Sequence, residues 1–298
     1  MRKTVKRAFV MNRNNWACLL PFVLCLLFLP AFIYSDDGKL GNIRKETKDS
    51  GSKRNPPKSD SSSSSSSSKR DNSSCDDTSS FLGEIFSPII GYILISPYYV
   101  PHHFWDEGFS TPLYFHPYPY FNANQGYFSL DETENTRFWA IDLSPEFKVY
   151  KDEVYGYGLN LNIRANFRIE LQADYNYLEE KLDNGSTDSL ALGNVNLLFR
   201  FAQNPYLLMR SGIGMNMLID TEDDFGFNFT YSADIYPIKP LFLSARIDLG
   251  GLGDATFIRF RATVGFIWKQ FELNAGFEYY DIGDASLEGG TLGFKVYF

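Results

Sequence analysis

The chain has 298 residues, of which 44% are hydrophobic and 21% charged, and this mixture excludes both a bundle of membrane helices and a chain that is disordered throughout. Its net charge of −8 makes nucleic acid an unfavourable partner. Aromatic residues reach 17%, which favours a protein built from Phe- and Tyr-rich β-strands.

Residues 1–35 have the pattern of a secretory signal peptide. Five bases within the first thirteen residues precede an apolar stretch, Trp16–Tyr34, and Ser35 ends a suitable cleavage site. An uncleaved anchor helix is the alternative. Cleavage would change the net charge to −13 and leave Cys75 as the remaining cysteine, so we expect neither an internal disulfide nor a cysteine metal site.

Two different segments follow the signal peptide. Residues 36–80 include an unbroken serine run, Ser61–Ser68, and have too little apolar surface to fold, so we expect a disordered Ser-rich linker. Residues 81–137 are rich in aromatic residues and proline, which forbids a long helix. We expect an irregular segment packed against the mouth of the domain that follows, with a membrane-interface segment or a lumen plug as the alternative.

Residues 138–298 repeat an alternation of apolar and polar positions, as in Phe271–Tyr279, where every second residue is apolar. Each repeat is near the length with which a tilted strand crosses a bilayer, and the number of repeats is even. The pattern therefore predicts an all-β domain, a closed antiparallel transmembrane β-barrel of about ten strands, or eight if the first two lie outside it. The expected strands are 138–150, 154–165, 167–178, 190–201, 206–218, 225–236, 241–250, 256–268, 271–280 and 290–298.

The polar face of these strands carries eight acids and nine bases. A charge that faced lipid near the midplane would cost about 2–4 kcal/mol, so we expect these side chains to face the lumen. A ten-stranded barrel is narrow and the charges nearly balance, which predicts a largely occluded lumen. A soluble β-sandwich or lipocalin-like barrel, with the apolar face inside, is the alternative. The predicted charge network comprises Asp142, Glu146, Lys148, Arg164, Arg168, Glu170, Asp174, Arg200, Arg210, Asp234, Arg246, Asp248, Arg259, Arg261, Glu272, Glu278 and Lys295.

The connections between strands are predicted to alternate between short turns and longer acidic loops, which would place the turns in the periplasm and the loops outside. We expect two of the longer loops at Glu179–Ser189 and Asp281–Gly289. Aromatic residues at the strand ends predict two girdles at the membrane surfaces, with Phe167, Phe201, Tyr236 and Trp268 among those on the turn side.

The last strand carries the most specific signal. Leu292, Phe294, Val296 and Phe298 alternate up to the C-terminal residue, with Tyr297 before it. This ending resembles the C-terminal signature of bacterial outer-membrane β-barrel proteins, and in particular the small barrels of the outer-membrane protein A and X type, which have eight strands. The resemblance implies recognition by the barrel-assembly machinery.

No catalytic or metal-binding motif is found in the predicted barrel. The histidines, His102, His103 and His116, all precede it, so a triad-type site in the barrel is excluded. The acidic stretch Asp220–Asp224 lacks the glycine and the final glutamate of an EF-hand loop, and we interpret it as a solvated loop. We expect no enzyme activity, no cofactor and no metal.

Together these features predict a non-enzymatic protein of the outer membrane of a Gram-negative-type bacterium, with a flexible N-terminal arm in the periplasm. Its role would be envelope integrity or surface interaction, and its partners would be outer-membrane lipid or lipopolysaccharide and, during biogenesis, the barrel-assembly machinery. A small-solute pore or transport channel is the first alternative, and a soluble secreted β protein is a weaker one.

Overall fold

The computed structural model describes residues 38–49, 114–121, 126–129, 132–203 and 206–298. The predicted signal peptide and the serine run lie outside these residues. One helix is described, α2 (Gly38–Asp49), and the strands are β1 (Tyr114–Phe115), β2 (Phe128–Ser129), β3 (Trp139–Tyr150), β4 (Val154–Ala165), β5 (Ile169–Lys181), β6 (Thr187–Gln203), β7 (Leu207–Ile219), β8 (Asp224–Ile235), β9 (Leu241–Leu252), β10 (Ala255–Trp268), β11 (Phe271–Ile282) and β12 (Ala285–Tyr297).

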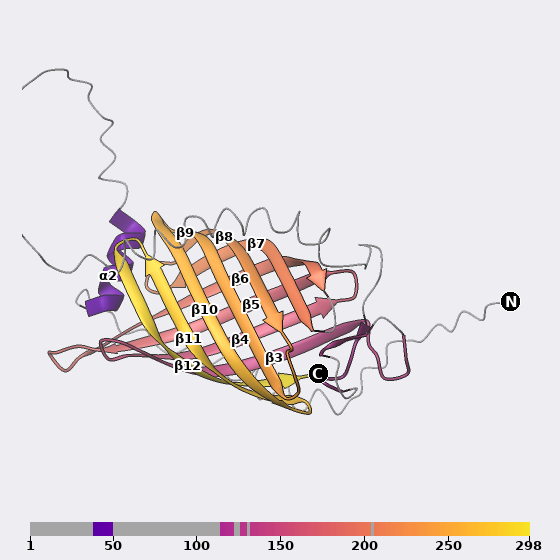
Figure 1. Ribbon diagram of the computed structural model, residues 1–298. Helices are drawn as coiled ribbons and strands as arrows, with labels where there is room; N and C mark the ends of the chain where they lie inside the picture. The colour runs from indigo at the N-terminus through magenta and orange to yellow at the C-terminus, as the bar shows by residue number, and fades with distance from the viewer. Residues whose placement is uncertain (1–37, 50–113, 122–125, 130–131, 204–205) are drawn as a thin grey trace, which may run out of the picture.

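Strands β3 to β12 form one closed antiparallel barrel, in which each strand pairs with its neighbours in sequence and β12 pairs with β3 (Figure 1). The prediction of ten strands is confirmed, and the eight-strand alternative is wrong because β3 and β4 are both part of the closed sheet. Closure leaves the barrel without a free edge, so every strand pairs with a neighbour on each side.

The alternation of side chains gives the barrel an apolar outside and a polar inside. In β5, Ile169 and Leu171 are exposed on the outer surface, whereas Glu170 and Asp174 are buried in the lumen. The other strands repeat this pattern, and large apolar side chains remain exposed on the outside, among them Phe147, Leu197, Ile213, Phe227, Val264, Phe266, Leu273 and Leu292.

Pairing is least complete at the seam between the last and the first strand, although the register is the same on both sides of the gap. Pairing of β12 with β3 is interrupted between Gly293, which lies opposite Glu146, and Val296, which lies opposite Leu143. Pro145 lies in this gap and has no backbone N–H to donate. The other strand pairs in the barrel are continuous apart from one bulge between Arg200 and Ala202.

Two of the predicted long loops are shorter than expected. The expected loop Asp281–Gly289 is mostly strand, because β11 ends at Ile282 and β12 begins at Ala285. Likewise, β5 and β6 extend into the expected loop Glu179–Ser189. Backbone pairing continues beyond the apolar band, because residues with polar side chains can pair through their backbones as well as apolar ones. The hydrophobic alternation therefore ends before the strand does.

The two girdle residues Phe201 and Tyr236 are both buried, which contradicts their predicted position at the membrane surface. Tyr236 points inward and packs against Phe242, with ring centroids 5.3 Å apart. Phe201 lies at the bulge in β6, which changes the direction of the side chains that follow it. Other predicted members of the turn-side girdle, such as Phe167 and Trp268, are exposed as expected.

Each open end of the barrel is covered by a segment that precedes β3. Helix α2 covers the end formed by the connections β3–β4, β5–β6, β7–β8, β9–β10 and β11–β12, which we call the loop-side mouth. The hairpin β1–β2 covers the opposite, turn-side mouth, where Phe115 pairs with Arg137 and Tyr127 packs against Tyr297. Figure 1 shows α2 at one end of the barrel and the C-terminus at the other.

Helix α2 contradicts the expectation of disorder for the first part of residues 36–80. Its buried side chains Leu40 and Ile43 join an apolar cluster with barrel residues such as Leu178 and Ile282. Burial of that face stabilises a helix whose other residues are mostly polar. The described residues between 114 and 137 include the hairpin β1–β2, which packs at the turn-side mouth.

Candidate functional site: the charged lumen

The lumen contains two layers of ion pairs, separated by a small cavity. The layer nearer the loop-side mouth consists of four acids and four bases, namely Glu146, Asp174, Asp248, Glu278, Lys148, Arg246, Arg259 and Arg261. The charges balance within this layer, which allows so many ionised groups to be buried together.

Glu278 is the centre of the loop-side layer and is completely buried. One carboxylate oxygen accepts hydrogen bonds from the Lys148 ammonium at 2.6 Å and from the Tyr150 hydroxyl at 2.7 Å. The other accepts from Nε and Nη2 of Arg259 at 2.9 and 2.5 Å. These bonds connect β3, β10 and β11 across the lumen.

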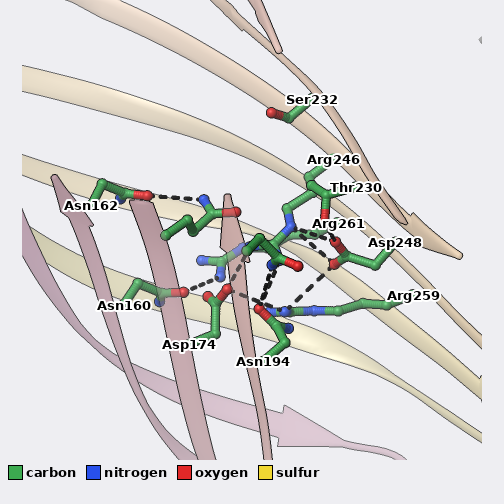
Figure 2. Close-up of polar contacts among 12 residues, drawn as sticks. Asn160, Asn162, Asp174, Asn194, Thr230, Ser232, Arg246, Asp248, Arg259 and Arg261 are labelled. Atoms are coloured by element: carbon green, nitrogen blue, oxygen red, sulfur yellow. Dashed lines mark hydrogen bonds and ion pairs between the residues drawn. The ribbon is translucent and has the colours of Figure 1, made fainter. Parts of the chain in front are cut away.

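Arg246 connects the opposite walls of the same layer (Figure 2). Its Nη1 donates to Asp174 at 2.5 Å, its Nε donates to Asp248 at 2.9 Å, and its Nη2 donates to Asn194 at 3.0 Å. Arg259 lies 3.7 Å from the carboxylates of both aspartates. Since Asp174 is in β5 and Arg246 is in β9, these contacts fill the centre of the barrel.

The second layer lies nearer the turn-side mouth. Arg210 donates to Glu170 at 2.6 Å and to Asp234 at 2.5 Å, and Arg164 pairs with Asp142 and, at 3.3 Å, with Glu170. The remaining pair in this layer is Lys295 with Glu272, at 3.2 Å.

Arg168 and Arg200 differ from the other predicted members of the network. Their guanidinium groups donate to backbone carbonyls, Arg168 to the carbonyl of Arg200 and Arg200 to that of Ala165. Arg200 also lies over the ring of Phe115, with its Cζ 5.0 Å from the ring centroid. These two arginines therefore attach to backbone carbonyls and to an aromatic ring, contacts that the alternation pattern does not predict.

A cavity of about 70 Å³ lies between the two layers. Neutral polar side chains line it together with the charged groups, and several of their buried atoms have no hydrogen-bond partner, including Ser144 Oγ, Gln172 Oε1 and Asn274 Oδ1. Its volume and its mixed donors and acceptors fit a few water molecules.

The predicted charge network does not include the neutral polar side chains that share the inward face of the strands. Asn176 accepts from Lys148 at 2.5 Å, and Thr230 donates to Asp248 at 2.5 Å. Both residues occupy the same inward positions of the alternation as the charged groups, so the pattern that predicted the charges was sufficient to find them.

The C-terminal residues divide between the two faces. Leu292 and Phe294 are exposed outside, and Val296 and Phe298 are partly exposed. Tyr297 points inward and donates its hydroxyl to Glu272. The backbone N–H of Phe298 donates to the carbonyl of Ile141 at 2.9 Å, which ties the end of the chain to β3.

His116 is the one histidine among the described residues, and it lies outside the barrel wall. Its side chain is buried, both ring nitrogens have no described hydrogen-bond partner, and burial lowers the pKa of its imidazole. Within the described ranges, no three His, Cys, Asp or Glu side chains are grouped as metal ligands, and no helix is long and apolar enough to cross a membrane. His102 and His103 lie outside those ranges.

No family model and no curated protein matches this chain. Among solved structures, the N-terminal β-barrel domain of Pseudomonas aeruginosa OprF aligns over 53% of this chain and 97% of that chain, at 12% identity and a TM-score of 0.29. Ail, the attachment invasion locus protein of Yersinia pestis, and Neisserial surface protein A each align over 54% of this chain and 96% of theirs, at 13% identity and a TM-score of 0.26. The fold assignment rests on the closed strand order itself.

Proposed function

We propose that this protein is a non-enzymatic β-barrel of the outer membrane of a Gram-negative-type bacterium, and that it serves envelope integrity or surface interaction. The observation that carries this proposal is the polarity of the barrel, which is apolar outside and charged inside. Ile213 is 59% exposed at the middle of β7, whereas Arg259 and Glu278 are completely buried. A soluble barrel would have the opposite arrangement, because exposed apolar surface is unfavourable in water.

The filled lumen supports a structural or interaction role over transport. Two layers of ion pairs occupy the barrel, and the cavity of about 70 Å³ between them has room for only a few water molecules. Apolar clusters under α2 and under the hairpin β1–β2 lie beyond the two layers. A solute would have to displace both covers and separate buried ion pairs, which costs several kcal/mol for each uncompensated charge.

The absence of histidine from residues 138–298 supports a role without catalysis. The buried carboxylates of the lumen are held by arginine and lysine at hydrogen-bond distance, as Glu278 is by Lys148 and Arg259. A carboxylate in such contacts is a poor general base, because its negative charge is already stabilised.

The membrane proposal is tested by the gel mobility of the outer-membrane fraction, with and without boiling in detergent. A closed barrel resists detergent and migrates as a compact species until it is heated, so we expect a heat-dependent shift. Recovery of the protein from the soluble or carbonate-extractable fraction would refute the membrane assignment and favour the secreted β protein.

The assignment of a closed lumen is tested separately, by planar-bilayer recording of the purified full-length protein. We expect no discrete conductance steps. Regular steps from this preparation, absent from a preparation of detergent alone, would refute the closed lumen and support the small-solute pore.

A further inference from the structure

Helix α2 contacts all five of the strand pairs that are joined at the loop-side mouth. Lys39 pairs with Asp152 in the β3–β4 connection, and Lys48 pairs with Glu222 in the β7–β8 connection at 2.8 Å. The carbonyl of Thr47 accepts from the N–H of Asp254 at 2.9 Å. The remaining two contacts are with Glu180 in β5, just before the β5–β6 connection, and with Gly283 in the β11–β12 connection.

The centre of this contact is Arg44, which is 2% exposed. Its Nη1 donates to Asp188 at 2.6 Å, its Nη2 donates to the carbonyl of Ser189 at 2.7 Å, and its Nε donates to Asp220. Burial acts to lower the pKa of this guanidinium, but the two aspartates together raise it above its ordinary value. The barrel therefore provides a fitted acidic pocket for one arginine of the helix.

The first turn of α2 is bound as specifically as its centre. The carboxylate of Glu180 accepts from the backbone N–H groups of Lys39 at 2.8 Å and Leu40 at 2.9 Å, which are the free donors of a helix N-terminus. Leu40 and Ile43 are buried in the apolar cluster below. The loop-side mouth thus recognises a short cationic helix by its N-terminus, its apolar face and its arginine.

In a membrane, this site and the hairpin β1–β2 lie on opposite sides. The chain enters β3 at the turn-side mouth, where the hairpin packs, and α2 lies at the far end of the ten strands. Because the turns are predicted to lie in the periplasm, a helix of this chain that occupies the loop-side mouth is expected on the outer side of the membrane. This differs from an N-terminal arm that lies wholly in the periplasm.

We propose that the loop-side mouth is a binding site for a cationic helix, and that residues 38–49 of the same chain occupy it on the outer side of the membrane. The site is acidic around the helix, with Asp152, Glu180, Asp188, Asp220 and Glu222 in contact with it. The helix carries four bases, Lys39, Arg44, Lys45 and Lys48, against Glu46 and Asp49. This proposal rests on the proposed membrane location of the barrel.

The sidedness is tested with single cysteines in the full chain carrying Cys18→Ser, Cys25→Ser and Cys75→Ser, labelled on intact cells with a membrane-impermeant maleimide. Lys45→Cys places the thiol on the exposed side of α2, Asp183→Cys marks the β5–β6 loop, and Glu134→Cys marks the turn side. We expect Lys45→Cys to label as Asp183→Cys does, and Glu134→Cys to label only after permeabilisation. Labelling of Lys45→Cys only after permeabilisation, while Asp183→Cys labels on intact cells, would overturn the proposal and leave the barrel assignment standing.

Docking is tested in the double variant Lys48→Cys with Glu222→Cys, in the same background without the native cysteines, treated with a short bismaleimide. We expect a crosslink within one chain, reduced at least about tenfold by Arg44→Glu, because reversal of the buried charge opposes both aspartates. The matched control is Lys45→Glu, which reverses the neighbouring exposed charge and should leave the crosslink unchanged. A crosslinked dimer would show that a second copy supplies the helix, and equal loss in both variants would refute the arginine pocket. If Asp183→Cys fails to label on intact cells, the proposed membrane location itself fails.

Discussion

Replacement of Glu278 by glutamine removes one negative charge from the centre of the loop-side layer and keeps the size of the side chain. The variant leaves Lys148 and Arg259 with weaker partners, Glu146 at 3.6 Å from the lysine and two aspartates at 3.7 Å from the arginine. The layer then carries one uncompensated positive charge in a site that excludes bulk water.

Breaking a buried ion pair by removal of one partner typically costs about 3–5 kcal/mol. The amide oxygen of glutamine can still accept from Lys148 and Tyr150, but its NH2 group then faces the donors of Arg259. The neighbouring carboxylates take up part of the freed charge, so we expect a loss of at least the lower limit of that range. A loss of about 3 kcal/mol corresponds to a decrease of roughly a hundredfold in the equilibrium constant for folding.

The assay is the denaturant midpoint of the full-length protein in lipid vesicles, followed by the mobility shift between folded and unfolded species. The matched control is Glu288→Gln, the same substitution in the exposed pair with Lys151 near the β11–β12 turn. Solvent screening makes such pairs weak, so this control should have the midpoint of the unmodified protein. Equal midpoints for Glu278→Gln and the unmodified protein would refute the view that buried charge pairing stabilises the barrel.

Three further predictions test the outside of the barrel and its two covers. Ile213→Arg, on the lipid-facing side, should destabilise the membrane-inserted barrel by about 2–4 kcal/mol and lower its recovery from the outer-membrane fraction. The control Asp183→Arg, in a loop, should be recovered in the same amount as the unmodified protein. Equal recovery of the two variants would contradict the membrane assignment. The pKa of His116 is lowered when the hairpin is docked. As the pH falls below about 6.5, the undocked hairpin therefore binds a proton more readily than the docked one, which favours undocking. The hairpin should then become easier to digest with protease. His116→Phe should remove this pH dependence, and an unchanged profile would assign it to another group. Gly253→Ala and Gly185→Ala both place a side chain at a residue with positive φ. Only the alanine at position 253 has its Cβ 2.5 Å from the carbonyl oxygen of Thr47 in α2. Gly253→Ala should therefore increase hydrogen exchange in α2, whereas Gly185→Ala should not.

The barrel could be predicted from the sequence because its alternation depends on local pattern alone. In β5, the residues from Ile169 to Tyr177 alternate regularly, and each side chain lies on the predicted face. The residues at which the strands begin and end were harder to predict. Near the mouths, inward positions are apolar too, as at Leu178 and Leu208, so the contrast between the faces disappears while the strand continues.

The partners within the lumen could not be predicted from the sequence. The alternation places Arg246 and Asp174 on the inside, but their contact depends on the closure of the barrel, which brings β9 opposite β5. Arg200 has the same inward position and lies against Phe115 instead, because the β1–β2 hairpin occupies that end. The near balance of acids and bases in the lumen was therefore predictable from the sequence, but the individual ion pairs were not.

Helix α2 was missed because only a few residues give it an apolar face. Leu40, Ile43 and Thr47 are spaced as on one side of a helix, with Arg44 among them, and all four are buried. This spacing was a usable signal, but in isolation so short and polar a helix is unstable in water. Its stability comes from the loop-side mouth, a surface that exists only after the barrel has closed.

The interrupted seam between β12 and β3 has a consequence for how the barrel would come apart. The ladder lacks a donor at Pro145, yet the strands on either side are joined through the lumen, since Glu146 pairs with Arg261 and Lys148 pairs with Glu278. Backbone hydrogen bonding is weakest at this seam. The side chains of β3 that reach past β12 to β10 and β11 reinforce the seam. A sideways opening of the wall, of the kind by which a strand could be added or a lipid admitted, would therefore begin at this seam and would require these two buried pairs to separate first.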